Sequence, residues 1–244
     1  MATWNPWHGC RKVSPGCLNC CVYRRDAEFG KDSSIIARTS SFALPVKRNR
    51  KGIYKLQPDE GAVYTCMTSD FFVEEADEWR PEAWKMIRER DDLHFVIITK
   101  RIHRFQVGLP KDWGEGYDNV TICCTCENQN MADYRLPIFL NLPIRHRTSI
   151  HEPMLEWIEI RRYLATGLIE QVTCGGESGP EARICDYAWI LEIMQQCVEY
   201  DIPFWVKQTG AKFKKGNRIY HIERKDQMHQ AEKAGVNYRY ERNN

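Results

Sequence analysis

A group of cysteines near the amino-terminal end of the sequence most constrains what this chain can fold into. Cys10, Cys17 and Cys20 are separated by six and by two residues, and Pro15 and Gly16 lie between them. This spacing does not place three side chains on one helix face, and proline and glycine are typical of turns, so we predict a loop that brings the thiols together. Cys17 and Cys20 form the C-x-x-C arrangement in which two sulfurs reach one metal ion or one cluster. The segment therefore indicates a metal-binding loop.

The spacing alone leaves the kind of site open. Three cysteine ligands suit an iron–sulfur cubane with one open iron, whereas a structural zinc site needs four ligands. His8 or Cys21 could supply a fourth zinc ligand, although the side chains of the neighbours Cys20 and Cys21 diverge. A redox-active thiol pair and cysteines without a metal are further interpretations. Iron–sulfur and zinc are thus the two leading interpretations of the spacing.

The composition excludes a strong overall charge as the basis of function. The 35 basic and 33 acidic residues give a net charge of +2, so attraction of a nucleic acid would need a local patch. Eleven cysteines in a chain for which we expect no secretory leader are typical of a reducing compartment, where thiols serve metal or redox chemistry. No apolar run approaches the ~20 residues that span a bilayer. We expect a cytoplasmic protein with no membrane partner and one main α/β domain.

Short apolar runs alternate with longer amphipathic stretches from about residue 61 onward, which is typical of repeated β-α units and a parallel sheet. We predict strands at residues 62–67, 94–99, 120–126, 146–150, 169–174 and 204–207, after a short first strand near Thr3 and Trp4. The clearest predicted helices cover residues 79–90 and 187–200, the second with Asp186 as a candidate cap, and a further helix is expected over residues 22–29. We expect residues 1–210 to form the domain and residues 211–244 a basic extension packed on it.

Each predicted strand after the first is followed by polar, charged or small residues. Because the carboxyl ends of parallel strands lie on one side of a sheet, these residues are candidates for one functional face. They are Ser69-Asp70, Thr99-Lys100-Arg101, Glu127-Asn128, His151-Glu152-Pro153, Gly175-Gly176-Glu177-Ser178-Gly179 and Lys207-Gln208. Surface charges at loop entries and tight glycine turns are the alternative interpretation. Cys124 and Cys126 lie in the strand at residues 120–126, where we expect them to fill the core, with hydrogen-atom donation as the alternative.

Basic residues gather in two segments, residues 47–55 and 212–218. Such runs are most often solvated loops. Tyr54 in the first segment adds an aromatic ring that could stack on a base while cations hold phosphates, so a nucleic acid is the alternative partner of these segments.

The ordered motifs of the chain resemble the phage-associated three-Cys-motif family, a family of unknown function. The resemblance covers about residues 4–210 and is carried by Trp4-Asn5-Pro6, Gly9-Cys10, Ser14, Gly16-Cys17, Cys20, Met67, Ser69-Asp70, Thr99-Lys100-Arg101, Glu127-Asn128, Glu152-Pro153, Gly175-Gly176-Glu177-Ser178-Gly179, Phe204, Lys207-Gln208 and Gly210. That family looks like a divergent branch of the radical S-adenosylmethionine (SAM) superfamily, and its strand ends are similar to those of spore photoproduct lyase relatives. The resemblance implies an incomplete parallel (β/α)6 TIM-like barrel of radical SAM type.

The resemblance also implies cofactors and roles for residues. A [4Fe-4S] cluster would be held by Cys10, Cys17 and Cys20, and SAM would bind its open iron. By this likeness Lys100 would face the carboxylate of SAM, and Thr125 or Ser69 its amino group or ribose. Gly175 and Gly176 would let the backbone approach the adenosyl group, with Glu177 as an acceptor. The expected cofactor-binding residues are Ser69, Asp70, Lys100, Thr125, Glu127, Gly175, Gly176, Glu177, Ser178, Lys207 and Gln208, and the catalytic candidates are Cys124, Cys126 and Glu152.

The function implied is that of a radical SAM enzyme, of lyase or transferase type, that abstracts hydrogen from a nucleotide, a nucleic acid or a related phage-linked substrate. An electron donor such as flavodoxin or ferredoxin, and a partner protein encoded beside it, are expected. A zinc-stabilised nucleic-acid-binding module without catalysis is the alternative, and a barrel that has lost or changed its metal is a third hypothesis. Iron, sulfide and SAM binding would favour the first hypothesis, and one zinc per chain with salt-sensitive nucleic-acid binding the second.

Overall fold

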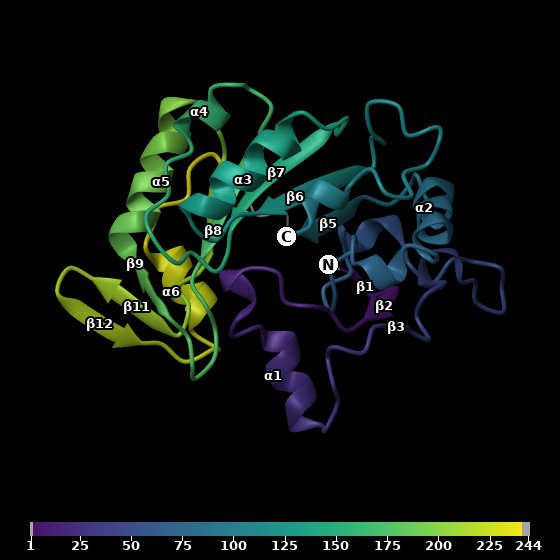
Figure 1. The fold of residues 1–244 in the computed structure, drawn as a ribbon, viewed down its shortest axis with the longest axis horizontal. Coiled ribbons are helices and arrows are strands. Elements are labelled where there is room, and N and C mark those ends of the chain that lie inside the picture. Colours follow the sequence, from purple (N-terminus) through teal and green to yellow (C-terminus); the bar gives the residue numbers. More distant parts are fainter. Residues whose placement is uncertain (1, 241–244) are drawn as a thin grey trace. The chain divides into compact units, whose positions relative to one another are not determined.

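Figure 1 draws a computed structural model, which describes residues 2–240. The chain forms two compact units. Unit 1 comprises Met1–Lys12, Val22–Cys123 and Asn141–His146, and unit 2 comprises Val13–Cys21, Cys124–Leu140 and Arg147–Asn244. The last four residues of the expected basic extension, 241–244, lie outside the described residues. Among the described residues, the structure contains no helix with the length and apolar character needed to cross a bilayer.

Parallel strands form the centre of unit 1. β1 (Ala2–Trp4), β4 (Val63–Thr65) and β5 (Phe95–Thr99) pair in parallel, and β6 (Val120–Thr125) follows β5 in the strand order. Buried and half-buried residues alternate along β4 and β5, as expected for strands with one face in the core. β6 enters unit 2 after Cys123, so both units contain part of this strand.

An aromatic core fills the space beside these strands. Phe71 packs edge to face against Trp84 with ring centroids 4.9 Å apart, and Trp84 packs in the same way against Trp113 at 5.0 Å. Such pairs contribute about 0.5–1.5 kcal/mol each beyond the burial of their area. The helices of unit 1 are α1 (Cys21–Glu28), whose first residue belongs to unit 2, and α2 (Arg80–Glu89). Its short antiparallel pair is β2 (Trp7–His8) with β3 (Ala37–Arg38), and its 3-10 turns are η2 (Leu44–Val46), η3 (Pro58–Glu60), η4 (Glu74–Ala76) and η5 (Ile102–Arg104).

Unit 2 continues the same pattern of parallel strands and helices. β8 (Gln171–Gly175) pairs in parallel with β7 (His146–His151) on one side and with β10 (Phe204–Gln208) on the other. The main-chain N–H of Cys126 donates to Ile150 O at 2.7 Å, just beyond the end of β6. The helices between these strands are α3 (Gln129–Leu140), α4 (Arg161–Leu164) and α5 (Tyr187–Glu199).

A second, three-stranded sheet belongs to unit 2. β9 (Ile184–Asp186) pairs in parallel with β11 (Lys212–Lys215), which forms an antiparallel hairpin with β12 (Arg218–His221). Asp186 caps α5, because its carboxylate accepts a hydrogen bond from Ala188 N at 3.0 Å. α6 (Gln227–Lys233) follows the hairpin in the chain (Figure 1). It contacts β10. The hairpin, α6 and β9 are elements that we did not predict from the sequence.

The expectation of an α/β fold with parallel strands is confirmed. Each strand predicted from residue 61 onward overlaps an observed strand, and the helices predicted at residues 79–90 and 187–200 are α2 and α5. The capping role of Asp186 is confirmed by its hydrogen bond. The finer assignment to an incomplete barrel of radical SAM type stays a prediction.

Candidate functional site

Cys10 lies in unit 1, directly after β2. Its main-chain N–H donates to Ser33 O at 2.7 Å, and its carbonyl accepts the hydroxyl of Tyr23 on α1. The half-buried thiol of Cys10 accepts a hydrogen bond from Arg101 Nη1, with 3.5 Å between nitrogen and sulfur. Arg101 thus places a cationic donor beside this sulfur.

The guanidinium of Arg101 is buried and is held by Arg11 and Asp70. Its Nη2 donates to Arg11 O at 2.7 Å, and its Nη1 lies 3.6 Å from Asp70 Oδ2. Asp70 in turn accepts hydrogen bonds from Thr99 Oγ1 at 2.8 Å and from Lys100 N at 2.9 Å. Arg101 thus links Cys10 to Asp70, and Asp70 in turn accepts a hydrogen bond from the main chain of Lys100.

Two further observations concern the expected cofactor contacts in unit 1. Ser69 donates its hydroxyl to Gly9 O, next to Cys10, and the Lys100 side chain is half-buried. Arg101 was among the residues expected at the strand ends, but we assigned it no cofactor or catalytic role. Its position directly after a predicted strand, in the Thr99-Lys100-Arg101 motif, is the signal that could have identified it.

Cys17 and Cys20 lie in unit 2, in a segment that we call the cysteine turn (residues 14–20). Pro15–Cys17 forms the 3-10 turn η1, in which Cys17 N donates to Ser14 O at 2.9 Å. Cys20 N donates to Cys17 O at 3.4 Å, which places the two cysteines one turn apart. Both thiols are half-buried, whereas Cys21 at the start of α1 is exposed. The loop expected from proline, glycine and the C-x-x-C spacing is therefore present at these two cysteines.

Glu127 holds the cysteine turn from the end of β6. Its fully buried carboxylate accepts Gly16 N on Oε1 at 2.9 Å and Arg135 Nη1 on Oε2 at 2.8 Å. A Cβ atom added at Gly16 would lie 2.9 Å from Glu127 Cδ, so this close approach requires glycine. Arg135 Nη1 also donates to Thr125 O at 2.7 Å. Glu127, expected as a cofactor contact, is thus engaged with the turn that carries Cys17.

Glu177 holds the other end of the same turn. Its Oε2 accepts Asn19 Nδ2 at 2.9 Å, and Arg183 donates to both carboxylate oxygens while its Nη1 donates to Pro15 O at 2.9 Å. Burial raises the pKa of Glu177, but the hydrogen bonds from Arg183 and Asn19 outweigh it and hold the pKa below its ordinary value. Glu177 is therefore an ionised acceptor for Asn19 on one side of Cys17, and its partner Arg183 donates to Pro15 O on the other side.

The hydroxyl of Thr125 is unsatisfied, as is Nε of Arg135. Its Oγ1 is buried and has no hydrogen-bond partner, although the residue is only 1% exposed. Buried polar atoms are nearly always hydrogen-bonded, so an orphaned hydroxyl indicates a missing water or ligand. This is the residue that we expected to contact the amino group or ribose of SAM.

Glu152, Lys207 and Gln208 come together at the ends of the unit 2 strands. Lys207 Nζ lies 2.8 Å from Glu152 Oε2, and Gln208 Nε2 donates to Glu152 Oε1 and, at 3.2 Å, to Gly176 O. A Cβ atom at Gly176 would lie 2.1 Å from Thr209 O, so the approach of the two chain segments requires glycine there. Gly175 is buried and Ser178 is half-buried. The structure thus brings the catalytic candidate Glu152 together with Lys207, Gln208 and Gly176, which we expected to contact the cofactor.

Cys124 and Cys126 are fully buried, with their sulfurs 4.0 Å apart. Burial raises the pKa of Cys126 well above its ordinary value, with the hydrogen bond to Cys124 acting in the same direction. The neutral thiol form is favoured, as in the core cysteines of other proteins. The expectation that these thiols fill the core agrees with this burial, and a catalytic role for them stays a prediction.

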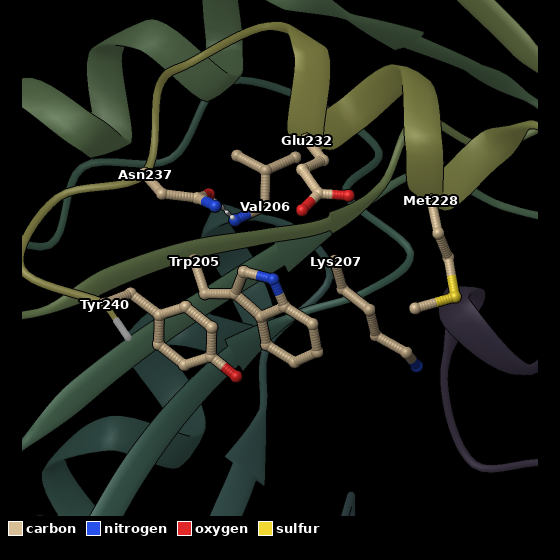
Figure 2. Close-up of a pocket in the computed structure, with 7 residues that line it drawn as sticks. All are labelled: Trp205, Val206, Lys207, Met228, Glu232, Asn237 and Tyr240. Atoms are coloured by element: carbon tan, nitrogen blue, oxygen red, sulfur yellow. Dashed lines mark hydrogen bonds between the residues drawn. The ribbon is translucent and has the colours of Figure 1, made fainter. Parts of the chain in front are cut away.

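A small pocket beside β10 includes one of the candidates, Lys207. It has a volume of about 180 Å³, and Figure 2 shows the ring of Trp205 against that of Tyr240, with centroids 4.9 Å apart and planes at 7°. Val206 N donates to Asn237 Oδ1 at 2.9 Å across the same pocket. Small-molecule sites usually measure about 300–1,000 Å³, so this pocket is small for a cofactor. Its lining residues are Trp205, Val206, Lys207, Met228, Glu232, Asn237 and Tyr240.

The described part of the chain contains no ready group of three or more His, Cys, Asp or Glu side chains that could hold a metal ion. Of the three expected ligands, Cys10 belongs to unit 1, and Cys17 and Cys20 to unit 2. The ligand set stays a prediction from the sequence spacing.

Comparison with protein families places the whole described chain in one family. The model of the protein of unknown function DUF5131 matches residues 1–240. The chain belongs to the DUF5131 family. No curated protein and no solved structure matches the chain. The expectation of a family of unknown function is confirmed for this DUF5131 member, and its likeness to radical SAM proteins remains a proposal.

Proposed function

We propose that this DUF5131 protein is a radical SAM enzyme that binds a [4Fe-4S] cluster through Cys10, Cys17 and Cys20 and acts on a nucleotide, a nucleic acid or a related substrate. The observation that carries the proposal is the cysteine turn, which two buried carboxylates, those of Glu127 and Glu177, hold with Cys17 and Cys20 one turn apart. A turn fixed in this way, with its thiols half-buried, suits metal binding better than core packing.

The donor set fits an iron–sulfur cluster in its chemistry. The four half-buried or exposed thiols are those of Cys10, Cys17, Cys20 and Cys21, whereas the other seven cysteines are buried. Ser14 Oγ lies 4.0 Å from Cys17 Sγ, and Arg101 donates to Cys10 Sγ. Hydrogen bonds to ligand sulfurs are one means by which proteins adjust the potential of such clusters. The orphaned hydroxyl of Thr125 supports a missing polar ligand in unit 2.

A bound cluster would supply the electron for reductive cleavage of the sulfonium bond of SAM, and the residues of the chain would bind, orient and shield the reactants. Thr125 Oγ1 would gain a partner from the amino group or ribose of SAM, and Lys100 would neutralise its carboxylate. The ion pair of Glu152 with Lys207 would hold polar groups of the substrate or cofactor beside β8 and β10. A flavodoxin or ferredoxin would supply the electron.

Anaerobic reconstitution with iron and sulfide tests the ligand assignment, and the chain offers a matched control. The variants Cys10→Ala, Cys17→Ala and Cys20→Ala should each lose most of the bound iron and the brown colour. Cys21→Ala removes the neighbouring exposed thiol and should keep the iron and sulfide content of the unaltered protein. Equal iron in all four variants, or one zinc per chain without sulfide, would contradict the proposal.

A further inference from the structure

The hairpin of β11 and β12, with the turn that follows it, is a strongly basic surface. We call residues 211–225 the basic ribbon. It contains one acidic residue, Glu223, in a chain whose net charge is only +2, so the rest of the chain is net acidic. Its six basic residues are Lys212, Lys214, Lys215, Arg218, Arg224 and Lys225. Such a local excess of cations attracts a polyanion where the overall charge does not.

The antiparallel register places cations on both faces of the basic ribbon. Lys215 is paired with Arg218 on one face, and Lys212 is paired with His221 on the other. All four residues of β12 are exposed, and β12 is at the end of the strand order β12-β11-β9 (Figure 1). A two-stranded ribbon with cations on both faces can contact phosphates on either side of a groove.

An aromatic ring accompanies these cations. The guanidinium of Arg218 lies over the ring of Tyr220, 4.9 Å from its centroid, and Tyr220 is 38% exposed. An exposed tyrosine beside cations offers a base a stacking surface while the cations contact the phosphates. This combination favours a nucleic acid over an acidic peptide, which offers no bases to stack.

The basic ribbon is joined to the residues that hold the cysteine turn. Ala211 N, at the start of the ribbon, donates to Glu177 O at 2.8 Å. Lys212 is in register with Ile184 of β9, and Arg183, directly before β9, donates to Pro15 O in the cysteine turn. A ligand bound along the basic ribbon would therefore lie on a segment that contacts Glu177 and β9, next to the residues that hold the cysteine turn.

We propose that the basic ribbon binds the phosphate backbone of a nucleic acid and presents it to the cysteine turn. The presentation to the cysteine turn rests on the proposed function, whereas the binding itself does not. A polymer, rather than a free nucleotide, is the substrate class that this extended row of cations fits.

Fluorescence anisotropy with a labelled single strand of about 20 nucleotides, and with its duplex, tests the binding on the full chain without iron. The variant K212Q/K215Q/R218Q removes three ribbon cations, and K47Q/R50Q/K51Q removes three exposed cations from the other basic segment as a matched control. Each lost phosphate contact reduces the slope of log K against log salt by about 0.7–0.9, so the ribbon variant should lose about 2–3 units of slope and at least about tenfold in affinity at low salt.

The control variant should bind within about twofold of the unaltered chain, and circular dichroism should show that both variants are folded. Equal losses in the two variants, no binding by the unaltered chain at low salt, or displacement by polyglutamate as effective as by unlabelled DNA would each overturn the proposal. Because this assay uses protein without iron, binding without cluster formation contradicts only the proposed enzyme, and cluster formation without binding contradicts only the ribbon.

Discussion

The structure predicts that Glu127 stabilises both the fold of unit 2 and the cysteine turn. Its carboxylate is fully buried and pairs with Arg135, whose side chain is 2% exposed. Glu127→Ala would leave the guanidinium of Arg135 with Thr125 O but without its counter-charge. Breaking a buried ion pair by removing one partner costs about 3–5 kcal/mol, and we expect a loss of this size in the free energy of unfolding.

Glu127→Gln separates the two roles of the carboxylate. A glutamine can keep an acceptor oxygen for Gly16 N, but it loses the charge that pairs with Arg135. Hydrogen bonds to charged groups contribute about 1.5–3 kcal/mol, so this variant should lose about that much stability. Urea unfolding at neutral pH measures both losses, and Glu115→Gln, at an exposed carboxylate in unit 1, is the control that should change little.

Hydrogen exchange measured by mass spectrometry reports on the turn itself. The Gly16 amide should exchange roughly tenfold to a hundredfold faster in Glu127→Ala, whereas Glu127→Gln should retain much of its protection. Gly16→Ala should resemble Glu127→Ala, because its Cβ would lie 2.9 Å from Glu127 Cδ. Unchanged exchange at Gly16 in Glu127→Ala, with stability within about 0.5 kcal/mol of the Glu115→Gln control, would refute this role of Glu127.

Three further predictions follow from burial and charge. In the native apo protein a thiol reagent should modify four cysteines quickly, and all eleven only after unfolding, since seven thiols are buried; fast labelling of more than four would contradict the described core. The stabilising effect of Glu177, measured as the difference in unfolding free energy from Glu177→Gln, should be full above pH ~4.3 and vanish as the pH falls through its lowered native pKa; a difference that does not change with pH would contradict the ionised clamp. Burial lowers the pKa of His151 to about 4, so the unfolded chain binds the extra proton and stability should fall by up to about 3 kcal/mol from pH 6.5 to 4, with a flatter profile in His151→Gln.

The sequence predicted the parallel strands well because their apolar runs are continuous and are separated by amphipathic segments. The strand expected at residues 94–99 is β5 at Phe95–Thr99, and the helix expected after Asp186 begins at Tyr187. These elements depend on local pattern and capping, which a single sequence displays.

The sequence did not predict the hairpin of β11 and β12. Its strands alternate basic and apolar residues weakly, and β11 is stabilised by pairing with β9, which lies more than 20 residues earlier in the chain. Such non-local pairing leaves little signal in the segment itself. The basic character of the segment was visible, but its arrangement as a ribbon was not.

In the candidate site, too, contacts between residues far apart in the sequence could not be predicted. Strand-end positions correctly indicated where polar residues gather, as for Glu152 with Lys207 and Gln208. The partners of Glu127 and Glu177 could not be read from the sequence, because Gly16 is 111 residues from Glu127 and Asn19 is 158 residues from Glu177. The contact of Arg101 with Cys10 was missed for a similar reason, since it spans 91 residues.

The most direct test of a radical SAM function is the formation of 5′-deoxyadenosine. After anaerobic reconstitution and reduction in the presence of SAM, the unaltered chain should release 5′-deoxyadenosine, and the same chain with Cys17→Ala should release none. The Cys21→Ala variant should behave like the unaltered chain. A reconstituted, reduced chain that releases no 5′-deoxyadenosine, and that instead holds one zinc through the same cysteines, would contradict the proposed function.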